Sequence, residues 1–226
     1  MAQRDELVAR LRSQSFDLLV IGGGIVGAGI ARDAAMRGLH VALIERGDFA
    51  SGTSSKTSKL IHGGLRYLEH GRLGLVYESL KDRQTLRTIA PQMVWPLAVM
   101  LPVYRGDPRP QWKIAAGLTL YDWLALHRNI RAHRMLSKQR TLRMEPKLNP
   151  AHLRAAATYV DCQMDDARLC LTNLLQAINF GAVCCNYVTL RAFEKSGAQL
   201  CGAIVEDLRT SEQFAVKATV VVNATG

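Results

Sequence analysis

The segment that most constrains the fold of this chain is residues 16–45, where two apolar runs flank a glycine-rich turn and a run of small residues. The first run, 16–21, is short and rich in β-formers, which is typical of a buried parallel strand. It leads directly into a G-x-G-x-x-G turn at 22–27, and the small residues that follow predict a helix to about Arg37. A second strand is predicted over 40–44, ending at Glu45. Strand, turn, helix, strand and acid in this order predict a dinucleotide site.

Each part of this unit has a mechanical reason. Gly22 permits the tight turn, Gly24 lets the backbone approach a pyrophosphate, and Gly27 lets the helix pack against the strand. The start of the helix offers unpaired N–H groups to phosphates. Glu45 is placed to accept hydrogen bonds from a ribose hydroxyl, which disfavours a 2′-phosphate and therefore NADP. This unit alone does not decide between FAD and NAD.

A stretch rich in hydroxyl side chains follows, with the sequence SGTSSKTSKLIHGGLRYL over residues 51–68. Its hydroxyls can donate to phosphates or to a flavin edge, and Gly63 and Gly64 would let the backbone pass close to a flat ring. A flexible Ser/Thr loop between two elements has the same composition. Composition alone therefore leaves both interpretations open.

Longer stretches carry a resemblance to a known family. GGGIVGAGIARDAAMRG, ALIERGDFASGTSS, SKLIHGGLRYLEHG, YVDCQMDDARL and VVNATG occur in this order, ending at residues 38, 55, 71, 169 and 226. Together they resemble the N-terminal portion of the FAD-dependent glycerol-3-phosphate dehydrogenases. The resemblance implies oxidation of sn-glycerol 3-phosphate to dihydroxyacetone phosphate, with a hydride passed to FAD and the electrons passed on to a quinone. It also implies a homodimer for the full-length family.

The same resemblance implies roles for individual residues. Arg66 would face the substrate phosphate with Tyr67 beside it, and His62 would orient the flavin or act as the general base. We favour the orienting role and identify no other base. Residues implied to contact FAD, besides Gly22, Gly24, Gly27 and Glu45, are Thr53, Ser54, Ser55, Ser58, Lys59, Leu60, His62, Val188, Ala224, Thr225 and Gly226.

The predicted fold class is α/β: a Rossmann-like FAD-binding domain, with a parallel sheet and helices, plus the start of a β-rich substrate domain. We predict an N-terminal extension over 1–15, the first part of the FAD-binding core over 16–90, a partly helical basic insertion over 91–150, and a return to the FAD-binding domain over 151–226. Short strands are predicted over 182–187, 190–194, 200–208 and 214–217. A further strand, Thr219–Asn223, should rejoin the first sheet. We expect a truncated product without the second half of the family, because one substrate-facing arginine does not complete a phosphate site.

The charge of the chain is strongly basic, +10 overall. Between residues 128 and 147 seven cations, several at three- or four-residue spacing, are opposed only by Glu145, which predicts one helix with a basic face. The face is either simply solvated or docks onto anionic lipid. Nucleic acid ranks last as a partner, since no nucleic-acid-binding motif accompanies the charge.

Several further expectations follow from composition. No apolar run is long enough to span a bilayer, and Met1–Asp17 lacks the features of a targeting peptide. Five cysteines without metal or disulfide spacing indicate buried thiols in a reducing cytoplasm. We expect no metal site and interpret Asp165 and Asp166 as helix-capping residues. The expected location is cytoplasmic, peripheral on the inner face of the membrane.

Two alternatives stay open. One is a module that binds FAD or a membrane without turnover. The other is a flavin-dependent amine or hydroxy-acid oxidase, which would keep the glycine turn and Glu45 but is not expected to carry SKLIHGGLRYLE.

Overall fold

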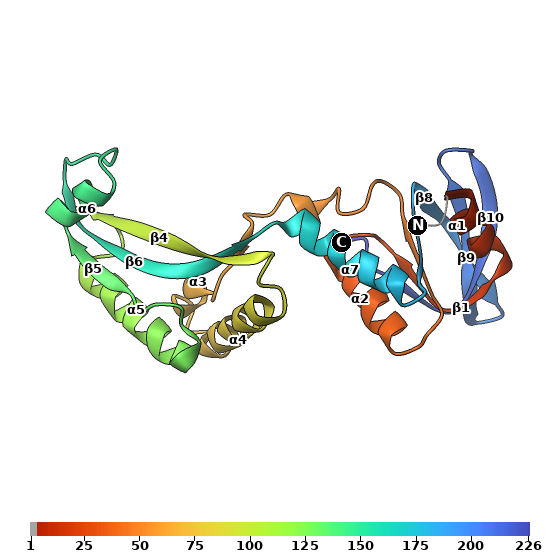
Figure 1. Ribbon diagram of the computed structural model, residues 1–226, viewed down its shortest axis with the longest axis horizontal. Helices are drawn as coiled ribbons and strands as arrows, with labels where there is room; N and C mark the ends of the chain where they lie inside the picture. The colour runs from red at the N-terminus through yellow and green to blue at the C-terminus, as the bar shows by residue number, and fades with distance from the viewer. Residues whose placement is uncertain (1–3) are drawn as a thin grey trace. The chain divides into compact units, whose positions relative to one another are not determined.

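The computed structural model describes residues 4–226 and divides them into two compact units (Figure 1). Unit 1 contains the described residues up to Ser58 together with Asp165–Gly226, and unit 2 contains Lys59–Met164. These divisions differ from the boundaries after residues 90 and 150 that the sequence predicts. The reason is packing: residues 59–90 and 151–164 pair with the intervening segment rather than with the dinucleotide unit.

Unit 1 is built on a six-stranded sheet in the order β7-β2-β1-β10-β9-β8. The first four strands are parallel, and β9 and β8 extend the sheet as antiparallel neighbours. The bounds are β1 Ser15–Ile21, β2 Val41–Glu45, β7 Val183–Asn186, β8 Val188–Ser196, β9 Gln199–Asp207 and β10 Glu212–Asn223. The predicted α/β class with a parallel, Rossmann-like sheet is confirmed.

The side chains of β1 alternate between the two faces of the sheet, which explains why both faces are covered. Leu18 and Val20 enter an apolar cluster with helices α2 (Ile25–Met36) and α7 (Asp166–Asn179). Leu19 and Ile21 enter the opposite cluster, which also contains Val8 and Leu11 of helix α1 (Arg4–Ser13). Successive strand residues point to opposite faces, so a fully apolar strand needs cover on both sides. The segment predicted as an N-terminal extension is therefore part of the core.

One long strand replaces two predicted ones. Residues 214–217 and 219–223 were expected as separate strands, but β10 is continuous. Its first half pairs antiparallel with β9, and its second half pairs parallel with β1 from Lys217 to Asn223. The prediction that Thr219–Asn223 rejoins the first sheet is confirmed.

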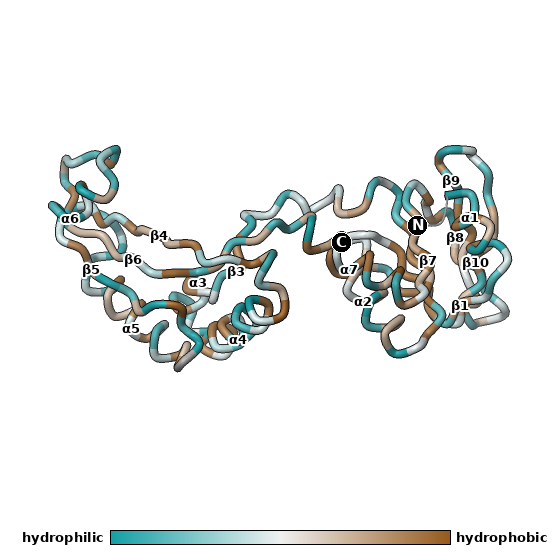
Figure 2. The backbone as a smooth tube through the Cα atoms, viewed as in Figure 1, coloured by the Kyte–Doolittle hydropathy of each residue, from teal (hydrophilic) through white to brown (hydrophobic). Residues whose placement is uncertain are grey.

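Unit 2 is organised around one long strand, β6 (Leu153–Met164). It pairs antiparallel with β3 (Leu60–Ile61), β4 (Val94–Tyr104) and β5 (Arg134–Ser137). The helices are α3 Leu65–Leu68, α4 Leu73–Ile89, α5 Gln111–Ala125 and α6 Lys138–Met144, with short 3-10 turns at Thr53–Ser55 in unit 1 and Leu126–Arg128 here. β4 is apolar along much of its length (Figure 2). It is an edge strand of the sheet, and an edge strand tolerates prolines such as Pro96 and Pro102.

Helix α5 buries Leu118, Tyr121 and Ala125, whereas Trp112 and Trp123 are 73% and 68% exposed and lie outside the core. One expectation for this unit needs correction. The cations of residues 128–147 do not share one helix, because the segment contains a 3-10 turn, strand β5 and the seven-residue α6. Their spacing coincides with a helical period without a helix that spans them.

All five cysteines are free thiols, and four of them, Cys162, Cys170, Cys184 and Cys185, are buried as predicted. No helix within residues 4–226 is long and apolar enough to cross a membrane.

Candidate functional site

The glycine turn that follows β1 is shaped by contacts that leave no room for side chains. A Cβ on Gly22 would lie 2.6 Å from the Ala224 carbonyl oxygen, and the φ of Gly22 is +113°. A Cβ on Gly27 would lie 1.9 Å from the Gly22 carbonyl oxygen. Backbone therefore packs directly on backbone at both positions, which confirms the mechanical reasons predicted for these two glycines.

The start of helix α2 is open to a ligand. Gly24 is its N-cap in extended conformation and supplies no capping side chain, and Val26 in the first turn is 62% exposed. The N–H of Ile25 donates to Ser54 Oγ at 2.8 Å. No acid lies in the first turn. The dipole of a helix N-terminus that has no acid in its first turn favours an anion such as a pyrophosphate.

Glu45 lies beside this turn at the end of β2 and is half-buried. Its Oε2 accepts from the Gly23 N–H at 2.7 Å, and its Oε1 accepts from the Gly47 N–H at 2.8 Å. A carboxylate has about four acceptor positions, so two remain for hydroxyl donors. The backbone thus fixes the carboxylate in place before any ribose arrives, a detail that spacing alone does not predict.

Residues 187–188 and 224–226 are far from the glycine turn in sequence, but they lie at the same edge of the sheet as the turn. The Ala224 N–H donates to the Ile21 carbonyl at 2.8 Å, and Thr225 Oγ1 donates to Asn223 Oδ1 at 2.8 Å. The Tyr187 N–H donates to the Gly47 carbonyl at 3.2 Å, which places Val188 near Glu45. The Val188 side chain itself is buried in the apolar core, so a contact with a ligand would use its backbone.

Asp166 holds the loop that follows β2, a role that the sequence did not reveal. Asp166 is buried and accepts from Thr57 N at 3.1 Å and from Thr57 Oγ1 at 2.7 Å. Asp165 caps α7 by accepting from the Arg168 N–H, as predicted. Asp166 is therefore more than a capping acid, and nothing local to it signals a partner 109 residues away.

These features fit the ADP half of FAD. The glycine turn leaves the backbone bare, the α2 N-terminus suits the pyrophosphate, and Glu45 keeps acceptor capacity for a ribose hydroxyl. Thr53, Ser55 and Ser58 lie in the same loop as Ser54, and their contacts with a cofactor stay predictions.

The remaining predicted site residues lie on one short stretch of unit 2, residues 59–67. His62 is exposed, and its Nδ1 accepts from the Gly64 N–H at 3.1 Å. Its ring meets Tyr67 edge to face, with centroids 6.3 Å apart. When Nδ1 accepts, the neutral ring carries its proton on Nε2 and presents a donor there. This tautomer suits an orienting role better than that of a base.

The two glycines after His62 are required by the protein's own side chains. A Cβ on Gly63 would lie 2.0 Å from Tyr121 Oη and 2.4 Å from Leu80 Cδ2. Gly64 has a φ of +73°, and a Cβ there would lie 2.5 Å from Tyr67 Cδ2. The expected reason, close passage of a flat ring, is not needed to explain these glycines.

Arg66 is exposed, and within residues 4–226 no hydrogen bond or ion pair engages its guanidinium, which leaves it available to an anion. Tyr67 is half-buried against a small apolar core that contains Val76 and Leu80. Lys59 and Leu60 lie just before, at the start of unit 2. The predicted substrate residues thus all lie in unit 2, and their roles stay predictions.

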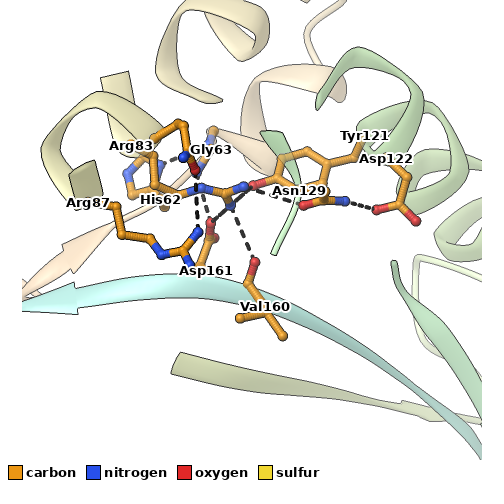
Figure 3. Close-up of polar contacts among 11 residues, drawn as sticks. His62, Gly63, Arg83, Arg87, Tyr121, Asp122, Asn129, Val160 and Asp161 are labelled. Carbon is orange, nitrogen blue, oxygen red and sulfur yellow. Dashed lines mark hydrogen bonds and ion pairs between the residues drawn. The ribbon is translucent and has the colours of Figure 1, made fainter. Parts of the chain in front are cut away.

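A buried ion pair, which the sequence analysis missed, lies directly behind this stretch (Figure 3). Arg83 of α4 and Asp161 of β6 are 1% and 3% exposed, and Arg83 Nη1 is 2.6 Å from Asp161 Oδ1. Tyr121 Oη accepts from Arg83 at 3.1 Å and donates to Asp161 at 3.0 Å. Burial, reinforced by Asp161, raises the pKa of Tyr121 far above its ordinary value and that of Tyr159 to about 12. Both phenols therefore stay protonated at neutral pH.

Within the described part of the chain no cluster of three or more His, Cys, Asp or Glu side chains is arranged to hold a metal ion.

Comparison with known proteins agrees with this geometry. The family model described as FAD dependent oxidoreductase matches residues 17–226. The glycerol-3-phosphate dehydrogenase of Synechocystis sp. is 44% identical over 220 residues, which cover 96% of this chain and 40% of that protein. The aerobic glycerol-3-phosphate dehydrogenase of Staphylococcus aureus is 40% identical over 225 residues, covering 99% of this chain and 40% of that protein.

A solved structure matches the fold. The glycerol-3-phosphate dehydrogenase of Bacillus halodurans complexed with FAD has a TM-score of 0.76 and 33% identity, over 99% of this chain and 36% of that one. The glycine oxidase of Geobacillus kaustophilus, at 22% identity and a TM-score of 0.65, shares the fold alone. This chain thus spans 40% of the length of the curated relatives named above.

Proposed function

The chain belongs to the FAD-dependent oxidoreductases, and from this premise we propose that it is the FAD-binding portion of a glycerol-3-phosphate dehydrogenase. The proposed reaction oxidises the C2 alcohol of sn-glycerol 3-phosphate to the ketone of dihydroxyacetone phosphate. The single observation that carries the substrate assignment is the 40–44% identity to curated glycerol-3-phosphate dehydrogenases along nearly the whole chain.

Unit 1 would hold the cofactor. The start of α2 binds the pyrophosphate, Glu45 accepts from a ribose hydroxyl, and the Ala224–Gly226 turn lies beside Gly22. Bound FAD supplies the hydride acceptor for the oxidation. The chain's own part is to fix the cofactor with backbone donors and one carboxylate, both already in place.

Unit 2 would supply the first substrate contacts. Arg66 would bind the phosphate, and His62, protonated on Nε2, would donate a hydrogen bond that orients the flavin. One charge-assisted bond contributes roughly 1.5–3 kcal/mol, whereas millimolar binding needs about 4 kcal/mol. We therefore propose that Arg66 acts with further cationic groups to complete the phosphate site.

The test uses the Staphylococcus aureus relative as a host. Its 225 matched residues are replaced by this chain, FAD is added, and glycerol 3-phosphate is mixed in without oxygen while the flavin absorption is recorded. We expect bleaching by glycerol 3-phosphate and not by glycine or L-proline, and a large loss of rate with Arg66→Met. An FAD-loaded chimera that an amino acid bleaches and glycerol 3-phosphate does not would contradict the proposal and favour an amine oxidase.

We also propose that the electrons pass to a quinone and that the protein acts in the cytoplasm at an anionic membrane surface. What supports the anionic docking is a hollow of about 440 Å³ in unit 2, which is lined by Arg105, Lys138, His152, Leu153 and Arg154. Arg131, Arg134, Arg140 and Arg143 are exposed as well. Vesicles with phosphatidylglycerol should sediment with the protein at low salt and release it at high salt. Equal binding to neutral vesicles would contradict the electrostatic docking.

A further inference from the structure

Asp161 gathers three donors on one carboxylate oxygen. Its Oδ1 accepts from Arg83 Nη1 at 2.6 Å, from Tyr121 Oη at 3.0 Å and from the Gly63 N–H at 3.0 Å (Figure 3). The first two are side chains of helices α4 and α5, and the third is the backbone of the turn after His62. The carboxylate therefore joins two helices to the His62–Gly64 turn, 98 residues away in sequence.

The turn is also locked by shape. Gly63 is pressed against Tyr121 and Leu80 so closely that a methyl group does not fit. The Gly64 N–H holds His62 by Nδ1, and Gly64 immediately precedes α3, which carries Arg66. A shift of the turn would therefore move the His62 ring and the start of α3 together.

Arg83 makes two further hydrogen bonds. Its Nη1 donates to the Val160 carbonyl at 3.3 Å, and its Nη2 donates to Asn129 Oδ1 at 3.3 Å. Asn129 in turn donates to Asp122, whose other oxygen is 2.7 Å from His133 Nδ1. The guanidinium thus has few alternative positions, and the carboxylate that it holds is equally fixed.

A buried ion pair is a poor way to gain stability, because apolar side chains of similar volume often serve as well. Apolar side chains cannot accept the Gly63 N–H, however, and a buried amide without an acceptor is unfavourable. The feature that an apolar replacement lacks is an acceptor oxygen at the turn.

We infer that Asp161 is a positioning residue: its carboxylate, whose buried charge Arg83 balances, holds the His62–Gly64 turn and thereby sets the places of His62 and Arg66. The inference rests on the proposed function for the roles of His62 and Arg66. The positioning itself is a property of unit 2 that can be measured without flavin or substrate.

Two double variants of the chain separate the effect of the acceptor oxygen from that of the charges. Arg83→Met with Asp161→Asn removes both charges and keeps an oxygen for the Gly63 N–H, whereas Arg83→Met with Asp161→Leu removes the charges and the oxygen. The readouts are amide exchange of Gly63 and the 15N shifts of the His62 ring, which report its tautomer. We expect exchange to be at least about tenfold faster in the Leu variant, with the His62 signals moving towards a mixture of tautomers. The Asn variant should stay near the unmodified chain.

Equal Gly63 exchange and equal His62 signals in the two variants would overturn the inference. A measurement on the unmodified chain covers the case in which the Leu variant does not fold. Gly63 should exchange as slowly as the buried amides of Leu80 and Tyr121, since they would open together. Exchange of Gly63 far faster than both would show that the turn moves independently and would equally overturn it. Failure of the proposed function would appear instead as loss of FAD binding or of reduction by glycerol 3-phosphate, with these readouts unchanged.

Discussion

Units 1 and 2 fix their functional segments in different ways. In unit 1 glycines leave out side chains: Gly22 and Gly27 let backbone contact backbone, and Gly24 brings no capping side chain to the start of α2. In unit 2 close packing at Gly63 is combined with charge: a buried Arg83–Asp161 pair with Tyr121 holds the His62–Gly64 turn. The first arrangement depends mainly on space, and the second depends also on electrostatics in a buried interior. The two units should therefore respond differently to substitution, pH and charge.

The largest expected effect comes from breaking the buried pair on one side. Asp161→Ala leaves the Arg83 guanidinium buried without its carboxylate, which should lower the free energy of unfolding by about 3–5 kcal/mol. Urea unfolding followed by circular dichroism measures the loss. The double variant Arg83→Met with Asp161→Asn is the control, because it removes both charges and keeps an acceptor oxygen, and it should lose much less. A single variant as stable as the double one would mean that the pair is not electrostatically coupled.

A steric break in unit 1 should be smaller. Gly27→Ala puts a methyl group 1.9 Å from the Gly22 carbonyl oxygen, and the strain should cost roughly 1–3 kcal/mol of unfolding free energy. Gly29→Ala on the same helix is the matched control, because nothing lies within 4 Å of its Cβ. It should raise stability by up to about 1 kcal/mol through helix propensity. Equal effects of the two substitutions would refute the close-packing explanation.

Alkaline pH should test the buried thiols of unit 1. In unit 1 burial raises the pKa of Cys170 to about 11 and that of Cys184 to about 12, from an ordinary value of 9.0. The unfolded thiols ionise first, so their contribution to stability is complete below pH 9 and is lost as pH rises towards 11 and 12. The loss should be about 1 kcal/mol per thiol at pH 10. Urea titrations near pH 8 and pH 10 should show a smaller pH dependence for Cys170→Ala, and an unchanged one would contradict this.

The smallest effect is expected for an exposed ion pair. Arg191 Nε and Glu206 Oε2 are 2.8 Å apart on the outer strands of unit 1, with the Arg191 side chain 48% exposed. Glu206→Gln should leave the urea midpoint within experimental scatter, since solvent screens such pairs. The same type of measurement on Asp161 then shows whether burial, rather than charge alone, gives the unit 2 pair its effect. A large loss for Glu206→Gln would weaken that distinction.

The contrast also explains what the sequence could predict. The segment 16–45 was predictable because strand, glycine turn, helix and acid are adjacent, and Thr219–Asn223 was recognisable as a buried strand. Arg83 was not, because an arginine on an amphipathic helix normally faces solvent, and its partner lies 78 residues away. Asp166 and Thr57 were missed for the same reason. The predicted basic helix failed because spacing alone does not show that the segment between Arg128 and Lys147 contains a strand.

Whether unit 1 binds FAD through its glycine turn can be measured by titrating FAD into the folded chain and following flavin fluorescence. We expect saturable binding that ADP competes for, retained by Gly29→Ala and strongly weakened by Gly27→Ala. A folded chain that leaves FAD free, or a Gly27→Ala chain that binds FAD as tightly as the unmodified one, would contradict it.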